Sequence, residues 1–530
     1  MSFEIDRRRL LGTGLAGGLV AAAPRRAFAQ RRDNVLRAVM HTALRANDPV
    51  IVASWSTRNH GYNVYDTLFS EDSKFGVRPQ MVETHEVSAD KLTWTFVLRS
   101  GLKFHDGAPV TSADVIASLK RWGQRDAMGQ LMMTYVAEWQ AADERTVKLV
   151  LKKPYGNVLQ TLAKPSSLVP FIMPARIAAT PADQAIPEQV GSGPFRFLAS
   201  EFRPGVRAVY ERNPDYVPRR EAPDSLAGGK VVKIDRYEWI NMADFQTAVN
   251  ALTTGEIDYF EVPPQDMLPI LTGTSGVKVV DTTPLGFANF ARMNWMSPLF
   301  AKKEIRQAVM HAMNQVDFVE AQVGNPEYFR TSAAMFMADT PFGSEVGWST
   351  KPDVAKAKDL LRQGGYKGEP VALMHVTDAA PLTPLSTVMA QALKSIGMTV
   401  NLMSMDWQST LSRRNRQEGG PQGWDLYVAA TAAADLYNPI SNQYVNAKGK
   451  AAYPGWPDDD EVERLRTAFA ESDDLAKQKE LATAMQARAY EVVTHVMAGQ
   501  YRQPVAHRAN VTGLVHAPAP VFWNVEKGRA

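Results

Sequence analysis

Residues Thr93–Val115, TWTFVLRSGLKFHDGAPVTSADV, hold the densest run of local structural signals in the chain. Residues 93–98 alternate β-branched, aromatic and aliphatic side chains, which is typical of a strand with one buried face. Residues 102–105 predict a second short strand. The Asp106-Gly107 pair that follows predicts a turn, because Gly tolerates the positive φ that such turns need.

A helix is expected to begin directly after this turn. Thr111 or Ser112 can cap it by accepting a hydrogen bond from a free backbone N–H, and Asp114 favours the positive end of the helix dipole. His105 and Asp106 are neighbours on an extended segment, so their side chains point to opposite faces. We therefore interpret this segment as structural and assign it no catalytic pair.

Length and composition indicate a large globular protein with more than one core. The chain has 530 residues, of which 45% are hydrophobic and 22% charged. A chain of this length normally folds around more than one hydrophobic core. No apolar run reaches the roughly 18 residues of a membrane-spanning helix. The net charge of +3 is already present in residues 1–29, where five Arg face Glu4 and Asp6. The neutral remainder gives no reason to expect a nucleic-acid partner.

The first 29 residues are expected to be a twin-arginine export signal. Arg7-Arg8-Arg9-Leu10-Leu11 resembles the twin-arginine motif, and a mildly apolar stretch follows it. Small residues at Ala27 and Ala29 predict cleavage before Gln30. The chain has no cysteine, so it can form no disulfide and carry no lipid on a cysteine. We expect a mature protein that is free in the periplasm.

The rest of the chain alternates strand and helix patterns. A β-α-β unit between Val371 and Met405 indicates an α/β fold. The segment Pro454–Asp460 is rich in Asp and could be read as a calcium loop. We favour a helix cap formed by Asp458 with Glu461. Further predictions are strands over 35–40, 146–151, 256–258, 287–294 and 424–428, and helices over 112–123, 248–255, 302–323, 356–361, 389–396, 462–469 and 474–493.

Several motifs together resemble one protein family. The pattern T-W-T-F-x-L-R-x-G-x-K-F-H-D-G-x-P-x-T-x-x-D-V is similar to the signature of the family 5 extracellular solute-binding proteins, the dipeptide and oligopeptide receptors of ABC importers. Gly191–Phe195, Arg212–Tyr216 and Gly255–Asp258 resemble further blocks of that family in its order. The resemblance runs from about Val35 to Val493, which is nearly the whole mature chain.

The resemblance implies a fold with two α/β lobes, the type II periplasmic-binding-protein fold with the extra subdomain of the peptide-binding cluster. Lobe 1 would span 30–286 with an inserted subdomain at about 66–185, lobe 2 would span 287–500, and residues 501–530 would return to lobe 1. Such a receptor closes over a small peptide or similar solute and delivers it to the permease subunits of an ABC transporter. We expect a monomer with no cofactor.

A secreted enzyme is the alternative from another functional class. The chain has no G-x-S-x-G, no H-E-x-x-H and no cysteine nucleophile, and its nine His residues lack ligand spacing. His311 is interpreted as an ordinary helix histidine. We therefore assign no catalytic residue and no metal ligand.

The resemblance implies ligand contacts in residues 405–443. Ala434-Asp435-Leu436-Tyr437-Asn438-Pro439 resembles a loop of oligopeptide receptors in which the aspartate pairs with the α-ammonium group of the peptide. The candidate ligand-binding residues are Asp435, Trp407, Tyr437, Asn438 and Trp424. Trp407 could instead be a core residue, and Asp435 could instead cap a helix beginning near Pro439.

Two positions depart from the family pattern. Ala432 replaces an aromatic residue, and Asn438 replaces an acidic residue before the proline. These changes leave other solutes open, namely opines, amino-acid conjugates, oligosaccharides and nickel complexes. Asp425, in a segment that reads as a buried strand, is interpreted as a structural carboxylate.

Overall fold

Strand β6 (Thr93–Leu98) lies inside a four-stranded sheet with the order β5-β6-β8-β7 in the computed structural model, which describes residues 34–379 and 381–528. The predicted export signal, residues 1–29, lies outside the described residues. Phe96 and Leu98 are fully buried, as the alternation predicts. The other strands of this sheet are β5 (Val82–Val87), β7 (Val136–Ala141) and β8 (Thr146–Leu151).

Helix α2 (Ser112–Trp122) begins where the sequence predicts. The Asp114 carboxylate accepts hydrogen bonds from the backbone N–H and the hydroxyl of Thr111, at 2.8 and 2.7 Å. The prediction of a strand at residues 102–105 is wrong, because only an isolated bridge between Lys103 and Pro109 is present there. The Gly107 turn, with φ of +88°, folds the segment back on itself within a few residues and leaves no room for a ladder.

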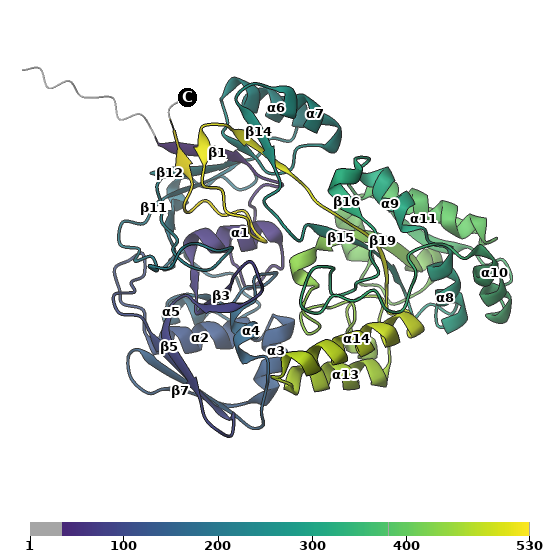
Figure 1. The fold of residues 1–530 in the computed structure, drawn as a ribbon, viewed down its shortest axis with the longest axis horizontal. Coiled ribbons are helices and arrows are strands. Elements are labelled where there is room, and N and C mark those ends of the chain that lie inside the picture. The colour runs from purple at the N-terminus through teal and green to yellow at the C-terminus, as the bar shows by residue number, and fades with distance from the viewer. Residues whose placement is uncertain (1–33, 380, 529–530) are drawn as a thin grey trace, which may run out of the picture. The chain divides into compact units, whose positions relative to one another are not determined.

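A seven-stranded sheet has the order β10-β11-β12-β1-β13-β21-β14. Its central strands β12, β1 and β13 are parallel, and the outer pairs are antiparallel. Helices α6 (Phe245–Thr254) and α7 (Leu268–Gly273) pack beside it (Figure 1). Its strands are β1 (Val35–Val39), β10 (Phe195–Phe197), β11 (Arg207–Arg212), β12 (Arg236–Ile240), β13 (Tyr259–Phe260), β14 (Val277–Val280) and β21 (Val505–Arg508).

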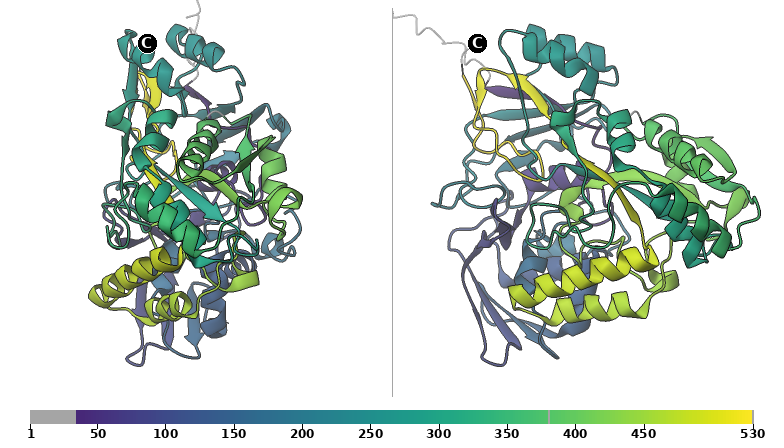
Figure 2. Two further views of the ribbon diagram at one scale, coloured as in Figure 1. Left: turned by 90° about the vertical axis from the view of Figure 1, so that its right-hand side faces the viewer. Right: turned by 45° about the vertical axis from the view of Figure 1, so that its right-hand side comes forward.

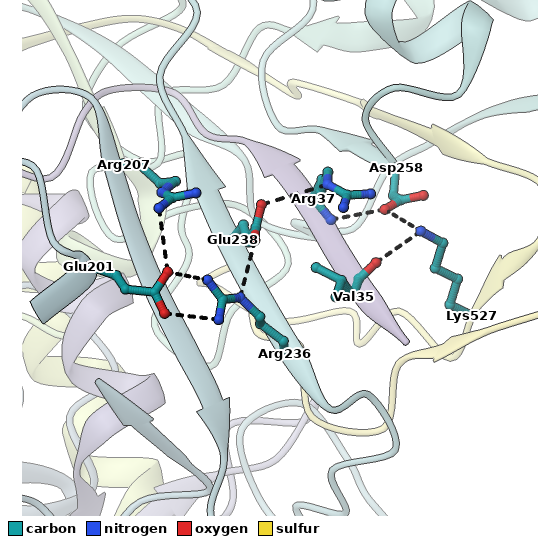
Figure 3. Close-up of polar contacts among 8 residues, drawn as sticks. All are labelled: Val35, Arg37, Glu201, Arg207, Arg236, Glu238, Asp258 and Lys527. Atoms are coloured by element: carbon teal, nitrogen blue, oxygen red, sulfur yellow. Dashed lines mark hydrogen bonds and ion pairs between the residues drawn. The ribbon is translucent and has the colours of Figure 1, made fainter. Parts of the chain in front are cut away.

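An ion pair and a hydrogen bond hold the C-terminal segment against this sheet. The Lys527 ammonium donates to the Val35 carbonyl at 2.9 Å and pairs with Asp258 at 2.8 Å (Figure 3). On the neighbouring strand β12, Arg236 contacts Glu238 of the same strand and Glu201 of the 3-10 turn Ala199–Glu201. The C-terminal segment therefore lies against the first strand of the described chain.

A six-stranded sheet has the order β16-β20-β15-β19-β17-β18. Strand β17 is parallel to β18 and β19, whereas β15 runs antiparallel between β19 and β20. Its strands are β15 (Phe287–Met293), β16 (Phe329–Arg330), β17 (Val371–Val376), β18 (Val400–Met405), β19 (Leu426–Ala432) and β20 (Val496–Tyr501). The helices between them are α8 (Lys303–Ala312), α9 (Gln315–Gln322), α10 (Val354–Gln363), α11 (Thr383–Ser395) and α12 (Trp407–Arg413).

The single helix predicted over 302–323 is two helices, α8 and α9. Met313 and Asn314 adopt extended backbone conformations between them. The buried Gln315 amide donates at 2.9 Å to the carbonyls of Ser332 and of Met497. The apolar spacing continues across the break, so periodicity alone does not reveal it.

Helices α13 (Asp460–Glu471) and α14 (Leu475–Val492) form an antiparallel pair (Figures 1 and 2). The residue that caps α13 is Asp459, which accepts from the Val462 N–H at 2.9 Å, so the assignment of the cap to Asp458 is off by one residue. Asp459 also pairs with Arg488 of α14 at 2.7 Å. This second contact fixes which of the successive aspartates turns inward.

The turn between α13 and α14 docks on the unit that contains the four-stranded sheet. The Gly156 N–H donates to the Ala470 carbonyl at 2.9 Å, and the Asn157 amide donates to the Phe469 carbonyl at 3.1 Å. A Cβ at Gly156 would meet the Ser472 carbonyl oxygen at 2.0 Å. Glycine is required here for the close approach of two backbones.

The chain passes between the two large sheets twice, at residues 281–286 and at residues 502–504. Buried side chains of both sheets belong to one continuous apolar cluster. No helix of the described residues is long and apolar enough to cross a membrane. The remaining α-helices and strands are α1 (Trp55–Val64), β2 (Asp66–Thr67), β3 (Phe69–Glu71), β4 (Val77–Pro79), α3 (Ala127–Tyr135), α4 (Val158–Ala163), β9 (Phe171–Ile172), α5 (Ala175–Ala178), β22 (Val511–Thr512) and β23 (Glu526–Lys527).

Candidate functional site

The carboxyl ends of strands from both large sheets meet at a small enclosed cavity. Glu261 follows β13 of the seven-stranded sheet, and Ala432 ends β19 of the six-stranded sheet. The cavity has a volume of about 30 Å³, enough for one or two waters. Ligands of α/β proteins characteristically bind beyond the carboxyl ends of parallel strands. The lining includes Trp55, Arg58, Glu261, Phe287, Ala432 and Ala434.

Arg58, in helix α1, places a buried guanidinium at this cavity. Its side chain is 5% exposed, and it donates to the Asn59 side-chain oxygen at 2.9 and 3.1 Å and to the Ser166 hydroxyl at 2.9 Å. Burial lowers the pKa of Arg58, and the carboxylates of Asp435 and Glu261 oppose that change. Within the described chain the guanidinium forms no ion pair. It therefore has capacity to attract an anionic group of a ligand.

Glu261 is held at the cavity wall by His41. Its carboxylate accepts from the His41 backbone N–H at 2.7 Å and contacts the imidazole Nδ1 at 2.9 Å. Burial would raise the pKa of Glu261, but His41 outweighs that effect, so the pKa is lowered. The site therefore keeps an ionised carboxylate opposite Arg58.

Asp435 lies in a short 3-10 turn, Ala433–Asp435, directly after β19. The side chain is half-buried, and its Oδ1 is enclosed without a hydrogen-bond partner in the described residues. Burial raises the pKa of Asp435, and the attraction of Arg58, the side-chain contacts with Ser166 and Trp55, and the charge of Lys164 oppose that rise. Residues 438–441 form turns, so Asp435 does not cap a helix at Pro439. An enclosed, unpaired carboxylate oxygen is costly unless a ligand donates to it.

Tyr437 joins the loop after β19 to β3 of the two-stranded sheet β3-β4. Its hydroxyl donates to Glu71 of β3, and its ring packs on Phe75 with centroids 5.2 Å apart. Burial raises the pKa of Glu71 to about 8. Asn438 is buried, and its side-chain oxygen accepts from the Ile440 N–H at 2.8 Å within its own turn. Both residues shape the loop that presents Asp435.

The two tryptophans of the candidate set lie elsewhere. Trp424 is fully buried, and its indole N–H donates to the carbonyls of Arg414 and Arg416 at 3.0 Å. Trp407 is half-buried at the start of α12, where its backbone N–H donates to Asp378 at 2.8 Å. Neither residue lines the small cavity in the part of the chain that the structure describes. Asp425 is buried and accepts from the Ser297 hydroxyl at 2.6 Å, which fits its interpretation as a structural carboxylate.

An apolar cleft of about 340 Å³ adjoins the small cavity and shares Trp55 and Phe287 with it. The rings of Trp55 and Phe287 pack with centroids 5.1 Å apart, and Phe287 stacks on Tyr501 at 5.3 Å. Met242 and Phe260 line the other side of the cleft. Sequence reasoning missed Trp55, Arg58 and Glu261, because these residues meet the Asp435 loop only through the fold.

Two chain crossings connect the two α/β sheets, and the carboxyl ends of their strands enclose a cavity. This arrangement defines the class of two-lobed solute-binding proteins. The described residues contain no group of three or more potential metal-ligating side chains. The chain belongs to the bacterial extracellular solute-binding proteins, family 5, whose model for the middle region matches residues 76–453. It is therefore a transport-associated binding protein and not an enzyme.

One similar protein is a probable peptide ABC transporter periplasmic-binding protein, y4tO, of Sinorhizobium fredii. It is 37% identical over 99% of each chain. Among solved structures, AgaA of A. tumefaciens R10 in complex with agropinic acid has a TM-score of 0.77 and 23% identity, covering 94% of this chain and 99% of that one. DppA of Helicobacter pylori with the peptide STSA has a TM-score of 0.78 and 20% identity, covering 93% and 98%. These structures share the fold.

Proposed function

We propose that this protein is the substrate-binding component of an ABC importer and that it captures a peptide or peptide-like solute between its two sheet regions. Support comes from the relative y4tO, which is named for peptide transport and matches along the whole chain. The solute would pass to the permease subunits in the membrane. We propose that the protein acts as a monomer.

The observation that carries the peptide proposal is the enclosed Oδ1 of Asp435, which has no hydrogen-bond partner among the described residues and directly follows Ala434, a residue that lines the cavity. A solute ammonium group would donate to this oxygen in a site shielded from water. Such a charge-assisted hydrogen bond contributes about 1.5–3 kcal/mol. Trp55, which lines the cavity, would pack against the same end of the solute.

Binding requires the site to open. A cavity of about 30 Å³ is far smaller than a dipeptide, because ligand pockets typically hold about 300–1,000 Å³. We propose that lobe 1 (30–286, with the insert at about 66–185) and lobe 2 (287–500) rotate apart at residues 281–286 and 502–504, with 501–530 returning to lobe 1. The solute then stabilises the closed form, because its contacts to both lobes exist only there.

An opine or another amino-acid conjugate is the second candidate solute. Arg58 offers a buried guanidinium without an ion pair among the described residues, and guanidinium groups bind carboxylates in a bidentate way. Ala432 and Asn438 also depart from the peptide-receptor pattern. An acidic conjugate that also bears an amine would satisfy both Arg58 and Asp435.

The protein would work in the periplasm after twin-arginine export. Arg7-Arg8-Arg9-Leu10-Leu11 supports that route.

A thermal-shift screen of the purified mature protein tests the proposed function. The library contains di- to pentapeptides, opines, oligosaccharides and nickel complexes. A ligand at 100 times its Kd stabilises the folded state by about 2.7 kcal/mol, which raises the Tm of a chain of this length by about 2–3 °C. Amine-bearing peptides or conjugates should give the largest shifts. Shifts from sugars or nickel complexes alone would refute the proposal.

A further inference from the structure

The apolar cleft beside the small cavity holds none of the solute groups that are assigned to Asp435 and Arg58. It has about 340 Å³, within the range of about 300–1,000 Å³ that is typical of ligand pockets. Its lining in the described chain includes no Lys, Arg, Asp or Glu. Phe245, which also lines the cleft, is 44% exposed, so the cleft opens to solvent on this side.

The cleft continues the charged cavity through two shared residues. Trp55 and Phe287 line both spaces, and their rings pack with centroids 5.1 Å apart. A solute whose charged end lies beside Asp435 and Arg58 would therefore reach the cleft with the group attached to that end. The cleft and the cavity would bind parts of one molecule.

The side chains that line the cleft determine which kind of solute group can bind there. Phe287 stacks on Tyr501, with ring centroids 5.3 Å apart, and Phe245 stacks on Phe260 at 6.3 Å. Flat aromatic walls bind apolar and aromatic groups through burial and ring–ring contact. Of the polar residues in the lining, His41 is engaged by Glu261, and Thr42, Asn241 and Gln503 are neutral. A charged group in the cleft would therefore lose its hydration without gaining an ion-pair partner.

From these observations we infer that the cleft formed by Trp55, Met242, Phe245, Phe260, Phe287 and Tyr501 is a specificity pocket for one apolar, preferably aromatic, side chain of the solute. The inference rests on the proposed function, because it assigns the charged end of the same solute to Asp435. It narrows the solute class to compounds in which an amine adjoins a bulky apolar group.

The test uses five probes and three proteins. The probes are Gly-Gly, Asp-Gly, Leu-Gly, Phe-Gly and 2-phenylethylamine, and their affinities are measured by calorimetry. The proteins are the wild type, Ala243→Trp and Ala355→Trp. Ala243 is exposed at the lip of the cleft, so an indole there fills the pocket without disturbing the core. Ala355 is exposed on α10, away from the cleft, and is the matched control.

For the wild type we expect Leu-Gly and Phe-Gly to bind about 10- to 100-fold more tightly than Gly-Gly, because burial of one large apolar side chain accounts for that difference. Asp-Gly should bind no better than Gly-Gly. Ala243→Trp should weaken Phe-Gly and 2-phenylethylamine at least about 10-fold, while Ala355→Trp leaves every affinity unchanged. The Tm and the far-UV circular dichroism of ligand-free Ala243→Trp report its fold and should match those of the wild type.

The outcomes separate the inference from the proposed function. If Gly-Gly and Asp-Gly bind as tightly as Phe-Gly, or if Ala243→Trp binds Phe-Gly normally, the pocket is refuted and the peptide receptor stands. If 2-phenylethylamine binds and Ala243→Trp loses it, while no peptide binds, the pocket stands and the peptide proposal fails. If no probe binds the wild type, the pocket is refuted, and the thermal-shift screen decides the proposed function separately.

Discussion

Replacement of Glu71 by Gln should change how the stability of the ligand-free protein depends on pH. Glu71 accepts a hydrogen bond from Tyr437, and burial raises the pKa of Glu71 to about 8. The repulsion of Asp72 acts in the same direction, and the hydrogen bond from Tyr437 opposes it. The side chain is 5% exposed, so solvent screens these effects little.

The sign follows from proton binding. Between the ordinary pKa of 4.5 and the raised value of about 8, the folded protein holds a proton on Glu71 that the unfolded chain has lost. Stability therefore falls as the pH rises through this window. From pH 5.5 to 7.5 the loss from this one group is about 2.5 kcal/mol. Glu71→Gln keeps an oxygen that can accept from Tyr437 and does not titrate, so it lacks this loss.

Urea-induced unfolding, followed by tryptophan fluorescence at pH 5.5, 6.5 and 7.5, measures the effect. The stability of Glu71→Gln relative to wild type should increase by about 2.5 kcal/mol across this range. Glu86→Gln removes an exposed carboxylate from β5 and serves as the control, which should follow the wild type. If the curves of Glu71→Gln and wild type run parallel, the pKa of Glu71 is not raised in the folded protein, and the reasoning from its burial is refuted.

Three further predictions concern docking, closure and export. Gly156→Ala should lower stability by about 1–3 kcal/mol in urea unfolding, because its Cβ would meet the Ser472 carbonyl at 2.0 Å, whereas Gly273→Ala, with open space around it, should change stability little; equal effects would refute the docked turn. Small-angle scattering should show a smaller radius of gyration with a saturating ligand than without one, and an unchanged radius would favour a preformed rigid site. Arg8→Lys combined with Arg9→Lys should leave unprocessed precursor in the cytoplasm; normal processing of this variant in cells without a working twin-arginine translocase would contradict that export route.

The sequence predicts the elements whose signals are local. The alternation in residues 93–98 and the cap formed by Thr111 and Asp114 give β6 and α2 correctly. Where one local sequence pattern fits two structures, tertiary contacts determine which structure forms. The α8–α9 break depends on where the Gln315 amide finds buried carbonyls, and the choice of Asp459 as the cap depends on Arg488.

Only part of the candidate site can be predicted from the sequence. The resemblance directs attention to the loop of Asp435 and Tyr437, and their role in binding remains a prediction. Arg58 and Glu261 are far from that loop in the chain, and no local pattern marks them. They become candidates only because the carboxyl ends of β13 and β19 enclose one cavity.

Calorimetric titration of wild type and Asp435→Asn with the tightest amine-bearing ligand from the thermal-shift screen tests the central claim most directly. The substitution removes the carboxylate that is proposed to accept from the solute ammonium, and it leaves that ammonium buried without its partner. Affinity should fall about 10- to 1000-fold, and an N-acetylated form of the same ligand should bind both proteins equally weakly. Unchanged affinity in Asp435→Asn, with a lowered Tm, would show that Asp435 is structural and would contradict the account.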